Sequence, residues 1–142
     1  MTVAVDRLPD RAIHPFHAAL LAGTVPLFLG ILLSDIAYAR SYQIQWSNFA
    51  SWLLVGALVL AGFTLLWAVI DLFRADRRGG RPLVYMLLVL ATWIFGFINA
   101  LIHAKDAWAI MPTSVILSVI VSVLACAATW VGFSNLRARG AA

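Results

Sequence analysis

The sequence is poor in charged residues, and its few acidic residues are all aspartates. Only 11% of the 142 residues are charged, whereas a soluble domain typically carries about 25%. Because 63% of the residues are hydrophobic, long stretches must face something other than water. The absence of glutamate excludes the H-E-x-x-H zinc motif, and neither a G-x-S-x-G motif nor a Walker loop occurs. The sequence therefore predicts no catalytic residues.

Cysteine is nearly absent too. Cys126 is the only one, which excludes an internal disulfide and a cysteine-rich metal site. It lies inside an apolar run, where we expect a small packing residue. The formal net charge is +4, but the basic residues occur in short clusters between apolar runs. This spacing indicates orientation in a membrane, and we expect no nucleic-acid partner.

Four apolar stretches reach the roughly 20 residues that a membrane-spanning helix needs. They cover residues 15–38, 49–73, 82–103 and 113–133, with short connections between them. Pro15 and Pro82 suit the first turn of a helix, whereas Pro26 should kink or loosen the first span. We predict an all-α, four-helix transmembrane bundle in which residues 1–142 form a single integral membrane domain.

Lysine and arginine are distributed unevenly between the two sides of these spans. Only Arg40 and Lys105 lie on one side. The other side carries Arg7, Arg11, Arg74, Arg77, Arg78, Arg81, Arg137 and Arg139. The positive-inside rule then predicts a multi-pass membrane protein with both termini in the cytoplasm. Trp46 and Trp108, in the two outer connections, fit an interfacial aromatic belt.

An alternative interpretation makes the first span a secretory signal peptide. The sequence "AYA" at residues 37–39 has the small-x-small pattern of a cleavage site. However, the apolar run is longer than a signal-peptide core, and Asp35 interrupts it. We expect the span to be retained.

Small and polar residues are expected where transmembrane helices pack, because lipid gives apolar side chains no reason to associate. The fourth span has such residues at four-residue intervals, and we predict that this ladder packs against the bundle. Its members are Ser114, Ser118, Ser122, Cys126 and Trp130.

A polar face is also expected on the third span, near the outer membrane surface. Thr92, Gly96, Asn99 and His103 lie on one helical face. Asp35 lies at a similar depth in the first span. Since polar groups in hydrocarbon usually face the interior, we predict that Asp35, Asn99 and His103 converge as one polar site at the outer surface.

The histidines at the start of the first span suggest a second site. His14, His17 and Met86, at the cytoplasmic end, are the candidate cofactor-binding residues. We expect no bound cofactor, and haem b is the alternative, because histidine is a common haem ligand. His17 and His103 lie about 30 Å apart across the membrane and cannot share an iron. Zinc held by His14, His17 and Asp71 is another alternative, although the spacing is unspecific.

The stretch "IHPFHAALL" at residues 13–21 resembles domain-of-unknown-function family 2231, a group of small four-helix bacterial membrane proteins. Its motif is an Ile-His-Pro sequence, matched by Ile13, His14 and Pro15, followed by a second histidine, here His17. The commoner form spaces the histidines more widely and has a proline after the second one. Relatives occur beside, or fused to, cytochrome c-type and quinoprotein dehydrogenase components. The resemblance therefore implies a redox accessory role in the membrane.

Three classes of function remain open at this point. The first is a non-enzymatic integral membrane anchor or accessory subunit of a redox system. The second is a haem- or quinone-binding membrane electron carrier, and the third is a small oligomeric transporter or channel. The expected partners are the lipid bilayer and either a second copy of the chain or a redox protein.

Overall fold

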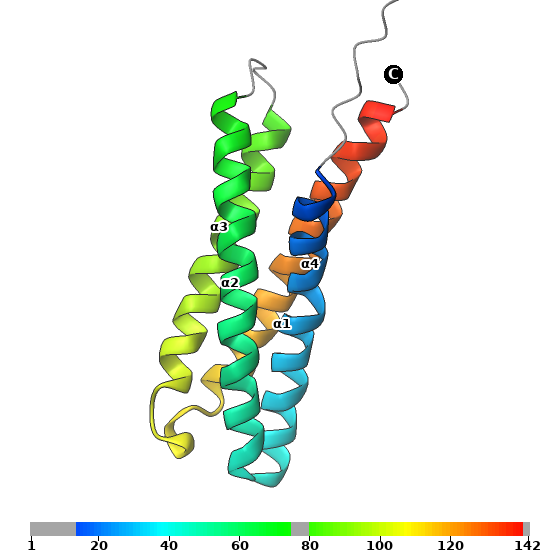
Figure 1. The fold of residues 1–142 in the computed structure, drawn as a ribbon. Coiled ribbons are helices and arrows are strands. Elements are labelled where there is room, and N and C mark those ends of the chain that lie inside the picture. Colours follow the sequence, from blue (N-terminus) through cyan, green and yellow to red (C-terminus); the bar gives the residue numbers. More distant parts are fainter. Residues whose placement is uncertain (1–13, 75–79, 141–142) are drawn as a thin grey trace, which may run out of the picture.

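The computed structural model, which describes residues 14–74 and 80–140, consists of four long helices (Figure 1). Each of the four is long and apolar enough to span a membrane, and the described residues contain no strand. The predicted all-α, four-span architecture is thus confirmed. The helices are α1 (Pro15–Ser41), α2 (Ile44–Arg74), α3 (Gly80–His103) and α4 (Thr113–Gly140), with a short 3-10 turn, η1 (Ala107–Ala109), before α4.

The start of the second predicted span differs from the structure. α2 begins at Ile44, before the predicted start at Phe49. The intervening turn carries polar residues, so hydropathy alone assigns it to a loop although its backbone is helical. Pro26 lies inside α1, which runs as one helix from Pro15 to Ser41, and the kink or loosened turn expected at Pro26 stays a prediction.

The connection between α1 and α2 contains only Tyr42 and Gln43. Tyr42 takes the left-handed conformation (φ 52°) and donates its backbone N–H to the carbonyl of Tyr38 at 2.7 Å. Such a backbone costs a non-glycine residue about 1–2 kcal/mol. The ring contacts explain why tyrosine is tolerated here. Its centroid lies 5.7 Å from that of Tyr38 and 5.6 Å from that of Trp108.

The helices form a ring in which each one packs on two neighbours. α1 contacts α2 and α4, and α3 contacts the same two helices. α1 starts and α4 ends at the end of the bundle where α2 ends and α3 starts (Figure 1). The start of α1 and the end of α4 therefore lie at the same end of the bundle. Four of the arginines used to predict the orientation, at positions 7, 11, 77 and 78, lie outside the described residues.

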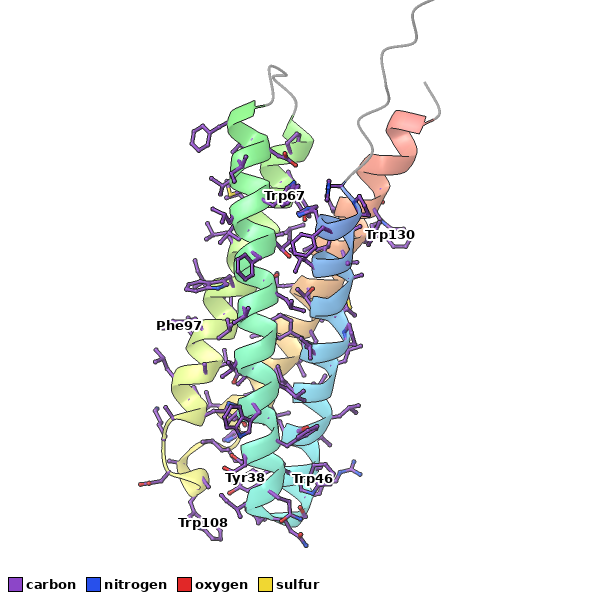
Figure 2. All side chains as sticks on the ribbon, in the orientation of Figure 1. Tyr38, Trp46, Trp67, Phe97, Trp108 and Trp130 are labelled. Carbon is purple, nitrogen blue, oxygen red and sulfur yellow. The ribbon has the colours of Figure 1, made fainter. Side chains whose placement is uncertain are left out.

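The bundle is apolar outside as well as inside. Trp52, Phe63 and Val123 are 76%, 55% and 63% exposed, which suits contact with lipid better than contact with water. Aromatic side chains also occur at both ends: Tyr38, Trp46 and Trp108 near the α1–α2 turn, and Trp67 and Trp130 toward the opposite end (Figure 2). The core is closely packed and contains Phe28, Ile31, Ala50, Leu54, Ala57, Ala61, Val121 and Ala125 in its larger cluster.

The serine ladder of α4 packs inward over only part of its length. Ser114, Ser118 and Ser122 are buried, as predicted, but Cys126 is exposed and Trp130 is 71% exposed. The prediction was wrong for these last two residues. At 3.6 residues per turn, each four-residue step rotates the side chain by about 40°, so the ladder drifts off the buried face.

Candidate functional site

Asp35, on α1, is the centre of a polar cluster that joins three helices. Its Oδ1 lies 2.9 Å from Nε2 of His103, at the end of α3. Its Oδ2 accepts a 2.6 Å hydrogen bond from the hydroxyl of Ser118 on α4. Ser118 Oγ in turn accepts a 2.8 Å bond from Nδ2 of Asn99, one turn below His103. We call Asp35, Asn99, His103 and Ser118 the Asp35 network.

The Asp35 network lies inside the bundle. Asp35 and Asn99 are fully buried, and the side chain of His103 is 2% exposed. The structure thus brings together the three residues predicted to converge, and it packs them between α1, α3 and α4. Carboxylate, amide and imidazole groups are costly in hydrocarbon, which is why such groups turn inward and pair.

The hydrogen bonds fix where one proton of the network must lie. His103 Nδ1 lies 3.0 Å from the backbone oxygen of Asn99, which can only accept, so Nδ1 carries a proton. If His103 is neutral, Nε2 then has a lone pair, and Asp35 must be protonated to bond with it. If His103 is charged, Nε2 donates to an ionised Asp35. In both forms one proton lies between the two residues, and the pair has no net charge.

The same reasoning sets the orientation of the Asn99 amide. The hydroxyl of Ser118 has one proton, which it donates to Asp35, so it must accept from Asn99 Nδ2. The hydrogen bonds therefore run in one direction, from Asn99 through Ser118 to Asp35, an arrangement in which neighbouring bonds strengthen one another. Asn99 Oδ1 remains buried without a partner among the described residues.

His17 belongs to a second cluster, at the opposite end of the bundle. It is 2% exposed, and its Nε2 lies 3.0 Å from the hydroxyl oxygen of Tyr85 on α3. Its ring stacks on Trp67 of α2, with 5.6 Å between centroids. His14 caps α1, because its Nδ1 accepts from the N–H of Phe16 at 3.3 Å, and its ring lies 5.4 Å from Trp67. We call His14, His17, Trp67 and Tyr85 the His17 cluster.

The predicted cofactor residues are only partly brought together. His14 and His17 share Trp67, whereas Met86 is half-buried and packs against the apolar cluster that includes Tyr85. Asp71 is exposed. Within residues 14–74 and 80–140, no three His, Cys, Asp or Glu side chains are placed to hold a metal ion. The alternative zinc site is therefore not formed.

Sequence reasoning missed two polar partners. The four-residue ladder predicts helix packing for Ser118, yet its hydroxyl donates to Asp35. The sequence pattern predicts only an apolar span around Tyr85, the single tyrosine of residues 82–103. A tyrosine hydroxyl buried in such a run needs a hydrogen-bond partner.

Comparison with known proteins places the chain in a family. The family model described as "Predicted membrane protein (DUF2231)" matches residues 13–138. No curated protein and no solved structure matches the chain. Because the match covers nearly all of the sequence and includes all four spans, the chain belongs to the DUF2231 family of predicted membrane proteins.

Proposed function

We propose that the protein is a non-enzymatic integral membrane anchor or accessory subunit of a redox system, and that its Asp35 network holds one proton within the bundle. The observation that supports this most is the 2.9 Å contact between two buried titratable groups, Asp35 and His103, on different helices. Ionisable side chains inside membrane bundles typically mark ion pathways or proton relays.

The neutral state of the Asp35–His103 pair suggests how it would serve a redox partner. Loss of the shared proton would leave a buried anion, and gain of another would leave a buried cation. Either state costs several kcal/mol unless an opposite charge compensates it. A redox partner that gains or loses an electron nearby supplies such a charge. The pair would then exchange its proton in step with electron transfer.

The proposal also includes a placement in the membrane. We infer a single integral domain over residues 1–142 in a bacterial inner membrane, with both termini in the cytoplasm. The start of α1 and the end of α4 lie at the same end of the bundle (Figure 1). Most of the arginines lie next to the ends of the spans on that side, as the positive-inside rule requires for a cytoplasmic side. The Asp35 network then lies in the outer half of the bilayer.

An Asp35→Asn variant tests the proton-holding role in the native host. Asparagine keeps the shape of the side chain, can accept from Ser118 and can donate to His103, but it removes the shared proton. In a strain lacking the gene, we expect wild-type protein to restore substrate-driven oxygen uptake of membrane vesicles, and Asp35→Asn to restore little of it at equal protein level.

Gly56→Ala is the matched control, since its Cβ would lie at an ordinary 3.8 Å from Leu27. It should restore uptake fully. Uptake that does not change when the gene is deleted would contradict the redox role itself. Full restoration by Asp35→Asn would contradict only the role of the proton.

A further inference from the structure

The imidazole of His17 has one ring nitrogen that the protein leaves unpaired. His17 is only 2% exposed, and its Nδ1 is buried without a hydrogen-bond partner among the described residues. An unsatisfied buried polar group costs about 1–3 kcal/mol, and native structures contain few of them. Such a group, in a side chain that contacts the rings of Trp67 and Tyr85, indicates a ligand.

The contact with Tyr85 decides whether this nitrogen is a donor or an acceptor. If the Tyr85 hydroxyl donates to Nε2, the proton of the neutral imidazole lies on Nδ1, and one N–H is left unpaired. If Nε2 donates to Tyr85 instead, both the Nδ1 lone pair and the tyrosine proton lack partners. The first arrangement leaves fewer unsatisfied groups, so Nδ1 is a donor. It therefore fits an oxygen acceptor and does not fit a metal ion such as haem iron.

The surroundings of His17 favour a flat, apolar ligand. The indole of Trp67 lies 5.6 Å from the imidazole with 29° between planes, and the ring of Tyr85 meets it edge-on at 6.0 Å. His17 lies in the first turn of α1, where a spanning helix reaches the depth of the lipid headgroups. Aromatic rings with few polar groups are typical of cofactor and small-molecule sites.

A groove in the same half of the bundle offers room for an apolar chain. It has a volume of about 370 Å³ and is lined by Val25, Cys126, Thr129, Trp130 and Phe133. Phe133, which lines the groove, also packs against the apolar cluster that contains Tyr85. Trp130, on its rim, projects outward from α4 (Figure 2).

We propose that the His17 cluster binds the carbonyl headgroup of a lipid-soluble quinone, with His17 Nδ1–H as the donor, and that the groove between α1 and α4 holds the quinone's apolar chain. A quinone provides what these residues require: an oxygen acceptor, a flat ring and a hydrocarbon tail that reaches the site from the bilayer. The inference concerns the end of the bundle opposite the Asp35 network, and it stands independently of the proposed accessory role.

Nitrogen NMR of the histidines tests this directly. The chain has only three histidines, so protein labelled with ¹⁵N-histidine in lipid nanodiscs gives few signals. We expect His17 to be neutral with its proton on Nδ1, and the Nδ1 signal to shift saturably when decyl-substituted benzoquinone is added. Decylbenzene, which lacks the carbonyl oxygens, should cause no such shift.

Two tyrosine variants provide the matched comparison. Tyr85→Phe removes the bond that fixes the tautomer, so quinone affinity should fall by up to about tenfold, the equivalent of one hydrogen bond. Tyr38→Phe alters another buried tyrosine at the far end and should leave affinity unchanged. A His17 Nδ1 without a proton, or a signal that quinone does not shift because a bound water alone satisfies it, would overturn the proposal. An equal shift with decylbenzene would also overturn it, and this control requires no variant.

Discussion

Replacing His103 with leucine should lower the free energy of unfolding by about 3–5 kcal/mol, because it leaves the carboxyl of Asp35 buried without its partner. Neutral hydrogen bonds between membrane helices average only about 0.6 kcal/mol, since the separated helices also find polar partners. The expected loss is larger here because the fully buried Asp35 keeps its cost of desolvation after the partner is removed. Reversible unfolding in mixed detergent and SDS measures the difference.

A double-mutant cycle separates this effect from simple loss of packing. Asp35→Asn alone should cost about 1 kcal/mol, since the amide can still bond to His103 and Ser118. In the Asp35→Asn background, His103→Leu should lower the free energy of unfolding much less than it does alone, because no carboxyl is then buried without a partner. Additive losses in the double variant would show that the two residues are not coupled.

The second large effect is expected at Gly132, where α4 approaches α1 and α3. A Cβ atom added there would lie 2.6 Å from Cδ2 of Leu21 and 3.0 Å from Cε2 of Tyr85. Both neighbours are themselves buried and cannot easily move. Gly132→Val should therefore lower the free energy of unfolding by about 1–3 kcal/mol through overpacking.

Gly56→Val is the control for Gly132→Val. It makes the same chemical change within a spanning helix, but its Cβ would meet only Leu27, at 3.8 Å. Its effect in the same SDS unfolding assay should be clearly smaller. Similar losses for the two variants would mean that the close approach of α4 at Gly132 is not a feature of the folded protein in the membrane.

Hydropathy was sufficient to predict the four helices, because each contains an apolar window of spanning length. It failed at the start of α2, where Ile44 begins a helical turn of mostly polar residues beyond the apolar run. α2 starts directly after the two-residue connection at Tyr42 and Gln43, a boundary that no window of hydropathy detects.

Helical periodicity predicted the buried face of α3 that carries Thr92, Gly96 and Asn99, but it did not predict all of the contacts between helices. Asn99 and His103 could be placed on one face of α3 because they are four residues apart. The roles of Ser118 and Tyr85 depend on how α4 and α3 are rotated against α1, and a single sequence does not contain that angle. The residues missed are thus the ones whose partners lie on another helix.

The number of protons held between Asp35 and His103 tests the account most directly. It can be measured in a lipid bilayer at neutral pH from the ¹⁵N signals of His103 together with the ¹³C signal of the Asp35 carboxyl. The hydrogen bonds predict a proton on His103 Nδ1 and one more proton between Nε2 and Asp35 Oδ1, so that the pair is either two neutral groups or two opposite charges. An ionised Asp35 beside a neutral His103, or a protonated Asp35 beside a charged His103, would contradict it.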